Sequence, residues 1–164
     1  MASTIVTFEL GGREVEVMVR PMTTLQSVLR NQLGATATKE GCRQGGCGSC
    51  AVLVDGEPML SCLLPVEDVA GRTVTTLESL SPVEGLHPIQ QAFVDASAFQ
   101  CGYCTPGMVM VAAALLEHDP APSADDICLA IAGNICRCTG YGPIVEAIAA
   151  AAEAIDPSAG TGTR

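Results

Sequence analysis

Nine cysteines in a chain of 164 residues constrain this sequence more than any other feature, because eight of them fall into two ordered groups. The two spacings are Cys42-x4-Cys47-x2-Cys50-x11-Cys62 and Cys101-x2-Cys104-x31-Cys136-x-Cys138. No secretory signal is visible at the start of the sequence, so we expect a cytoplasmic protein, in which disulfides are rare. Export together with a signal-bearing partner stays open. We therefore predict two metal sites, each with four thiolate ligands.

The first group has the C-x4-C-x2-C spacing that plant-type [2Fe–2S] ferredoxins use. Residues 40–50 contain four glycines, which allow the backbone to wrap closely and present N–H groups to anionic sulfurs. Cys62, which we expect on the strand after the Asp55-Gly56 turn, would be the fourth ligand. A zinc site is the alternative, but zinc knuckles usually pair two short C-x2-4-C units, so this spacing favours an iron–sulfur cluster.

The second group lies next to two expected helix starts. Its first two cysteines precede Pro106, and its last two precede Pro143. Helix N-termini carry unpaired N–H groups and a positive dipole end, so two of them facing each other would stabilise one anionic cluster. Zinc remains a stronger alternative here because C-x-C is not diagnostic, although the neighbouring ferredoxin-type group favours a second iron–sulfur cluster.

The ninth cysteine, Cys128, stands apart from both groups. It lies between Ile127 and Leu129 on an expected helix, so we predict a buried side chain that acts as a small hydrophobe. The two histidines, His87 and His118, are far apart and away from the cysteines, which argues against a Rieske-type site.

Charge and hydropathy exclude several classes of function. The formal net charge is −10, and two clusters of about −2 each would add to it. Such a chain is repelled by nucleic acid and by anionic membrane surfaces. The longest apolar run, residues 108–116, is too short to insert into a membrane. No acid–base pair or activated nucleophile stands out, so we expect no catalytic residue on this chain.

Hydrophobic periodicity changes near residues 81–85, where alternation with period two gives way to helical spacing. We therefore expect an α+β, ferredoxin-like domain at residues 1–80, a helical domain at 81–156 and a disordered tail at 157–164. The expected elements are a hairpin at 4–20, a helix at 25–33, strands at 51–54, 59–64 and 73–76, and helices at 88–96, 106–116, after Ser123 and at 143–155.

Three segments together closely resemble one family. They are the cysteine loop at 42–50, the string Q-C-G-Y-C-T-P-G-M at 100–108 and the string G-N-I-C-R-C-T-G-Y at 133–141. The family is the small iron–sulfur subunit of molybdenum hydroxylases, which include xanthine dehydrogenase, carbon monoxide dehydrogenase and aldehyde oxidoreductase. The resemblance covers about residues 4–155. It implies an N-terminal β-grasp ferredoxin domain and a C-terminal four-helix bundle, each with one [2Fe–2S] cluster.

The resemblance also implies partners and a direction of electron flow. A large subunit would carry a molybdopterin cofactor, and a medium subunit with FAD, or a cytochrome, would accept electrons. Electrons would pass through the helical-domain cluster and then the ferredoxin-domain cluster. Gln100 would hydrogen-bond the pterin, and Cys138 would lie closest to it. The alternatives are a free-standing two-cluster ferredoxin and a zinc-bound interaction module, and the substrate of the complex is not readable from this chain.

Overall fold

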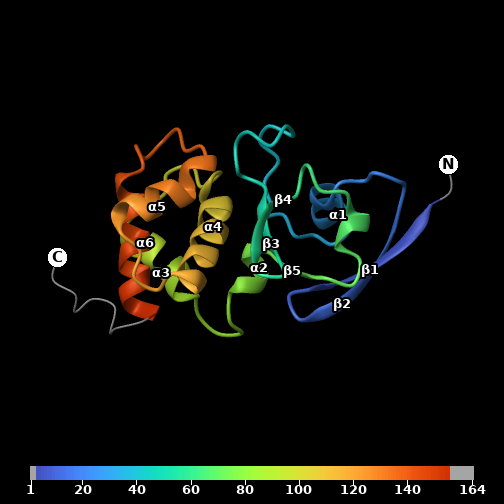
Figure 1. Cartoon of the computed structure of the whole chain (residues 1–164), viewed down its shortest axis with the longest axis horizontal. Helices are drawn as coiled ribbons and strands as arrows, with labels where there is room; N and C mark the ends of the chain where they lie inside the picture. The colour runs from blue at the N-terminus through green and yellow to red at the C-terminus, as the bar shows by residue number, and fades with distance from the viewer. Residues whose placement is uncertain (1–2, 156–164) are drawn as a thin grey trace.

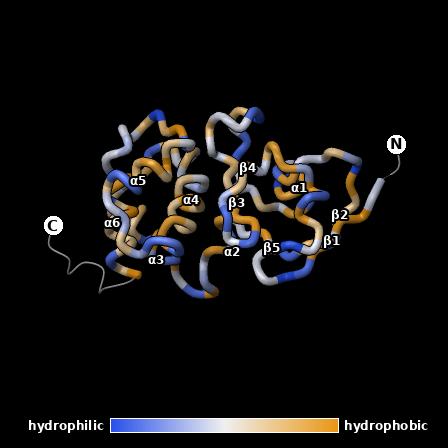
Figure 2. The backbone as a smooth tube through the Cα atoms, viewed as in Figure 1, coloured by the Kyte–Doolittle hydropathy of each residue, from blue (hydrophilic) through white to orange (hydrophobic). Residues whose placement is uncertain are grey.

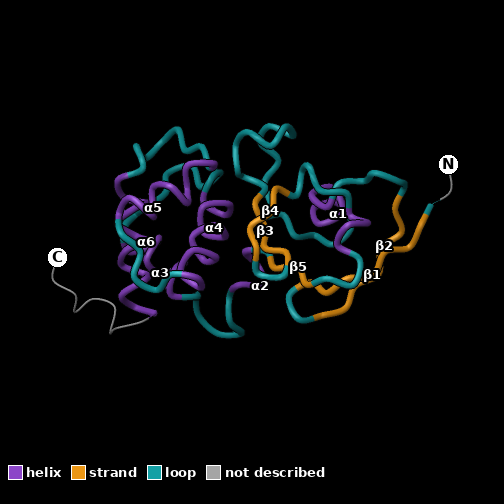
Figure 3. Tube along the Cα trace, in the orientation of Figure 1, coloured by secondary structure: helices purple, strands orange, loops and turns teal. Residues whose placement is uncertain are grey.

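The computed structural model describes residues 3–155, in which strands gather at one end and helices at the other (Figure 1, Figure 3). The predicted tail at 157–164 lies outside the described residues. A five-stranded sheet has the order β2-β1-β5-β3-β4, in which β1 and β5 are parallel and the other neighbours are antiparallel. The strands are β1 Thr4–Leu10, β2 Arg13–Val19, β3 Ala51–Val54, β4 Glu57–Leu60 and β5 Thr73–Thr75.

The predicted hairpin is confirmed, with β1 and β2 paired from Thr4↔Val19 to Leu10↔Arg13. Gly11 and Gly12 form its turn with φ values of 56° and 79°, a left-handed conformation that two-residue hairpin turns require and glycine adopts without strain. Side chains on one face of both strands are buried, as period-two alternation requires for a sheet that covers a core.

Helix α1 (Leu25–Asn31) covers this buried face. Thr24 caps its N-terminus and accepts a hydrogen bond from the Ser27 backbone N–H. Leu25 and Leu29, one turn apart, are fully buried among the valines of the sheet. The alternation of the strands and the helical spacing of these leucines therefore produce one apolar core in this half of the molecule.

The second hairpin differs from the expectation at its end. Strand β4 stops at Leu60, so Cys62 lies in the turn that follows rather than on the strand. The Leu63 N–H bonds back to the Leu60 carbonyl at 2.9 Å, which closes this turn, and the Ser61 hydroxyl donates to the Cys50 carbonyl at 2.7 Å. Three short elements were also not expected: η1 Val66–Val69, α2 Leu77–Leu80 and η2 Ile131–Gly133.

Four longer helices form the other half, close to the expected positions: α3 Pro88–Asp95, α4 Thr105–His118, α5 Ala124–Ala130 and α6 Gly142–Ile155. The Ser123–Asp126 capping box at α5 is confirmed. Phe93, Met108 and Ile148 are among the buried side chains of this second apolar core. Within residues 3–155, no helix is long and apolar enough to cross a bilayer.

Helix α4 joins the two halves, because it lies alongside β3 (Figure 1). Leu53 on β3 packs with Met110 and Ala114 on α4 in a small separate cluster. Figure 2 shows apolar stretches at both ends of the molecule, on the strands at one end and on the helices at the other. This contact places the N-terminus of α4, which follows Cys104, beside the first cysteine loop.

Candidate iron–sulfur sites

The first four cysteines come together from two segments. Cys42, Cys47 and Cys50 lie in the loop between α1 and β3, and Cys62 lies in the turn after β4. The thiols interact in two pairs, Cys42 with Cys47 and Cys50 with Cys62. Cys50 and Cys62 are buried, whereas the other two are partly exposed. The site therefore has an inner and an outer pair of sulfurs.

Backbone N–H groups point at Cys42 of the outer pair, as the glycine content of the loop predicts. The Cys42 sulfur accepts from the Gln44 and Gly46 N–H groups at 3.4 and 3.3 Å. The Gln44 N–H bond is the main reason that the Cys42 pKa falls to about 7, with the Cys47 side chain and the Gly46 N–H contributing further. Burial raises the pKa of Cys50 to about 11. The loop thus stabilises thiolate at its open side.

Two glycines in this loop leave room that a larger residue would fill. A Cβ on Gly41 would lie 2.7 Å from the Cys47 sulfur. A Cβ on Gly45, whose φ is +75°, would lie 2.5 Å from Leu63 Cδ1. The backbone therefore passes close to the sulfurs and to the turn that carries the fourth cysteine, which is the wrapping that an anionic cluster needs.

The second four cysteines line one hollow of about 160 Å³. The Cys101 and Cys138 sulfurs lie 3.6 Å apart and are exposed, and Cys104 interacts with Cys136 in the buried part. Cys104 is the N-cap of α4, and the last two cysteines precede α6. The prediction that both halves of this group lie before helix N-termini is confirmed.

The second site also combines raised and lowered thiol pKa values, although here one cysteine of each pair is lowered. Burial raises the pKa of Cys104 to about 12. Burial opposes ionisation of Cys136 as well, but hydrogen bonds from the Thr139 hydroxyl, 3.2 Å away, and from the Thr139 N–H bring its pKa to about 7. The Tyr103 N–H lowers the pKa of Cys101. Each site therefore combines thiols that ionise easily with thiols that need a metal to do so.

This arrangement fits a binuclear cluster better than a single metal ion. A [2Fe–2S] cluster takes two thiolates on each iron, which matches the two-plus-two pairing at both sites. The Thr105 hydroxyl, next to Cys104, is buried and has no hydrogen-bond partner among the described residues, so a sulfur acceptor nearby would satisfy it.

Polar side chains around the second site hold its loops in place. Gln100 donates from Nε2 to the Cys138 carbonyl at 3.1 Å, and the Tyr103 hydroxyl donates to the Glu40 carbonyl at 2.7 Å. Sequence reasoning missed the role of Tyr141, whose hydroxyl accepts from the Cys136 N–H at 2.9 Å and lies 3.2 Å from the Asn134 carbonyl. The position of Tyr141 at the end of the G-N-I-C-R-C-T-G-Y string was the one sequence feature that pointed to this role.

The expectation that Cys128 is buried is wrong, because its side chain is exposed on α5. This short helix buries only Ile127. The next residue along a helix points about 100° away from its neighbour, so Cys128 and the 78% exposed Leu129 face outward. Cys128 remains apart from both groups of sulfurs.

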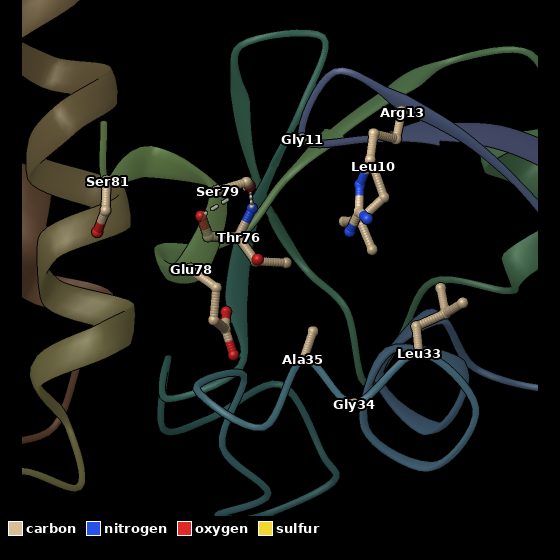
Figure 4. A pocket seen from close by; sticks show the side chains of 10 residues that line it. All are labelled: Leu10, Gly11, Arg13, Leu33, Gly34, Ala35, Thr76, Glu78, Ser79 and Ser81. Carbon is tan, nitrogen blue, oxygen red and sulfur yellow. Dashed lines mark hydrogen bonds between the residues drawn. The ribbon is translucent and has the colours of Figure 1, made fainter. Parts of the chain in front are cut away.

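A polar pocket of about 340 Å³ lies away from the cysteines (Figure 4). It is formed by the β1–β2 turn, the segment after α1 and helix α2. In it, Thr76 and Ser79 cap one another, and the Glu78 carboxylate accepts from the Ala37 N–H at 2.7 Å. The described residues that line this pocket include no cysteine or histidine.

Comparison with known proteins finds two family models that together span most of the chain. A "2Fe-2S iron-sulfur cluster binding domain" family model matches residues 3–105, and a "[2Fe-2S] binding domain" model matches residues 76–149. The nicotinate dehydrogenase of Pseudomonas putida has a subunit that is 44% identical over 150 residues, which are 92% of this chain and 96% of that one. The nicotine 6-hydroxylase small subunit of Paenarthrobacter nicotinovorans is 44% identical over 140 residues, 85% of this chain and 84% of that one.

A solved structure agrees with these relatives. In the crystal structure of quinoline 2-oxidoreductase from Pseudomonas putida 86, one chain has 42% sequence identity and a TM-score of 0.90, covering 93% of this chain and 95% of that one. The family models, the relatives and the solved structure therefore all point to the same iron–sulfur chemistry as the paired cysteines. The chain belongs to the family of small [2Fe–2S] subunits that transfer electrons within molybdenum hydroxylases.

Proposed function

We propose that this chain holds two [2Fe–2S] clusters, each on its own domain. A β-grasp ferredoxin domain, residues 1–80, would use the first four cysteines, and a four-helix bundle, residues 81–156, would use the second four. The observation that carries the proposal is the arrangement of eight thiols as four pairs at two places. The assigned ligands are Cys42, Cys47, Cys50 and Cys62, and Cys101, Cys104, Cys136 and Cys138.

The second site faces a large subunit that carries the molybdopterin cofactor. Its two outer cysteines are exposed, and apolar side chains surround them: Phe99, Tyr103 and Ile135 are 39%, 46% and 57% exposed. Exposed apolar groups beside a redox site are typical of a surface that a protein partner covers. A free-standing ferredoxin has no need of such a surface, and the relatives that are named as subunits of larger enzymes also favour a complex.

Gln100 and Cys138 are the residues of this chain nearest to that partner's pterin. The Gln100 amide N–H is already bonded to the Cys138 carbonyl, so these two residues form one exposed unit beside the outer sulfurs. When bound, the clusters supply one-electron redox chemistry, taking electrons from the molybdenum site and passing them to a FAD subunit or a cytochrome. The complex would work in the cytoplasm.

The test is to co-express the chain with its neighbouring subunits and to measure iron, acid-labile sulfide and molybdenum in the purified complex. We expect two irons and two sulfides for each four-cysteine site, as the cluster formula requires. Cys42→Ser and Cys136→Ser should each remove one of two distinct paramagnetic signals from the reduced complex. Zinc in place of iron, or a chain that purifies without a molybdenum partner, would refute the proposal.

A further inference from the structure

The two cysteine sites touch each other through a pair of hydrogen bonds, of which the one from Asn134 is buried. The Ile135 N–H donates to the Cys47 carbonyl at 3.0 Å, and the Asn134 side-chain amide donates to the Gly48 carbonyl at 3.1 Å. Cys47 belongs to the first site, and Ile135 directly precedes Cys136 of the second. Residues far apart in the sequence therefore connect the two sites with few covalent steps between them.

The two cysteine loops are also in close steric contact here, as two glycines show. A Cβ on Gly48 would lie 2.6 Å from Asn134 Cγ and 2.6 Å from the Gly133 carbonyl oxygen. A Cβ on Gly107, in the first turn of α4, would lie 2.3 Å from the Gly48 carbonyl oxygen. Ser49, from the first cysteine loop, also lines the hollow of the second site. No side chain larger than hydrogen fits at either glycine without moving one loop relative to the other.

The Asn134 side chain is not needed to hold its own loop. The Asn134 backbone N–H bonds to the Ile131 carbonyl at 2.8 Å, and its carbonyl lies 3.2 Å from the Tyr141 hydroxyl. The side chain, 4% exposed, instead reaches across to the other cysteine loop. A buried amide that bonds a distant backbone carbonyl costs free energy if that partner moves away, so this bond resists separation of the loops.

We propose that Asn134 is a positioning residue that sets the distance between the two cysteine sites and thereby the rate of electron transfer between them. This inference rests on the proposed function, in which both sites hold clusters. One electron leaves the helical-half site and enters the sheet-half site, so one is oxidised as the other is reduced, and no bond forms or breaks. Because tunnelling falls steeply with distance, a small displacement of one loop slows this step.

The test compares Asn134→Leu, which removes the amide at similar size, with the control Asn31→Leu, in which an exposed amide bonded to Ser27 within its own helix is lost. Both are made in the complete complex. We measure iron and sulfide, the magnetic splitting between the two fully reduced clusters, and the rate of intercluster electron transfer after rapid photoreduction. In Asn134→Leu we expect full cluster content, a smaller splitting and a slower intercluster rate, with no change in Asn31→Leu.

A second pair of variants covers the case in which Asn134→Leu fails to assemble. Gly107→Ala displaces the Gly48 carbonyl from the other side and should also reduce the splitting, whereas Gly133→Ala, with nothing within 4 Å of the added Cβ, should not. An unchanged splitting and rate in fully loaded Asn134→Leu or Gly107→Ala overturns the positioning role. Loss of iron with unchanged splitting in the remaining loaded molecules overturns it too. A wild-type complex without two clusters refutes the proposed function instead.

Discussion

Replacing Gly48 by alanine tests the junction between the cysteine loops through stability. Gly48 has a φ of +70° and is buried. An L-residue in this left-handed conformation costs about 1–2 kcal/mol. The added Cβ would also lie within 2.6 Å of the Gly133 carbonyl oxygen, which is backbone, and overpacking of this kind costs about 1–3 kcal/mol. We therefore expect Gly48→Ala to destabilise the chain by about 2–5 kcal/mol.

Two other glycines separate these contributions. Gly12, in the β1–β2 turn, has a φ of +79° and nothing within 4 Å of an added Cβ, so Gly12→Ala should show the conformational cost alone. Gly46 lies two residues from Gly48, lacks a positive φ and also has open space around it. Gly46→Ala keeps the N–H that bonds Cys42 and should be neutral or stabilising by about 0.4–1 kcal/mol through the unfolded state.

The assay is thermal and urea unfolding of the cluster-loaded protein, followed by far-UV circular dichroism and by cluster absorbance. For a chain of this size, 1 kcal/mol shifts the midpoint by about 2–4 °C, so Gly48→Ala should lower it by about 4–20 °C. The order of midpoints, from highest to lowest, should be Gly46→Ala, then Gly12→Ala, then Gly48→Ala. If Gly48→Ala were no worse than Gly12→Ala, the close contact with the second loop would not exist in solution.

Three further predictions concern other parts of the chain. Phe93→Ala should cost about 3–5 kcal/mol in urea unfolding because Phe93 is 1% exposed in the helical core, while Val94→Ala, at a 47% exposed position, should stay within about 0.5 kcal/mol. Burial lowers the pKa of His87, whose neutral ring caps α3, below the ordinary 6.5. The contribution of this cap to folding stability is therefore complete above pH 6.5 and is lost as the pH falls through the folded-state pKa of His87. His87→Asn should keep the cap and lose this pH dependence of stability. Cys128→Ser should leave iron content and cluster spectra unchanged, and a loss of iron would show that the ligand assignment is wrong.

Local sequence patterns predicted most of the helices and strands because the residues that start, end and pattern each element lie close together in the sequence. The alternation of Val15, Val17 and Val19 across a Gly-Gly turn identifies the first hairpin, and the Ser123–Asp126 capping box identifies the start of α5. The cysteine spacing likewise predicted which thiols lie close together in the folded chain. The hairpin and the capping box depend on neighbours within a few residues, which the sequence displays directly, whereas the cysteine groups are recognised by their characteristic spacing.

The features that the sequence predicted wrongly or not at all depend on contacts between residues far apart along the chain. The end of β4 before Cys62 is set partly by a hydrogen bond from Ser61 to Cys50, eleven residues away. The exposure of Cys128 follows from which face of α5 meets the other helices, and flanking apolar residues do not reveal that face. The bond from Asn134 to Gly48 spans 86 residues, so only the folded chain brings this pair together.

The difference between outer and inner sulfurs bears on the route that we propose for electrons. At the second site, the exposed pair Cys101 and Cys138 faces the surface where a partner can approach. The buried pair leads inward, because Cys136 follows Ile135, whose N–H bonds the Cys47 carbonyl, and Cys104 precedes the first turn of α4, which contacts the first loop. An electron that enters at the exposed sulfurs therefore has its shortest route onward through the buried ones. This asymmetry of the second site is compatible with the proposed order of the relay, in which electrons reach the helical-half site first.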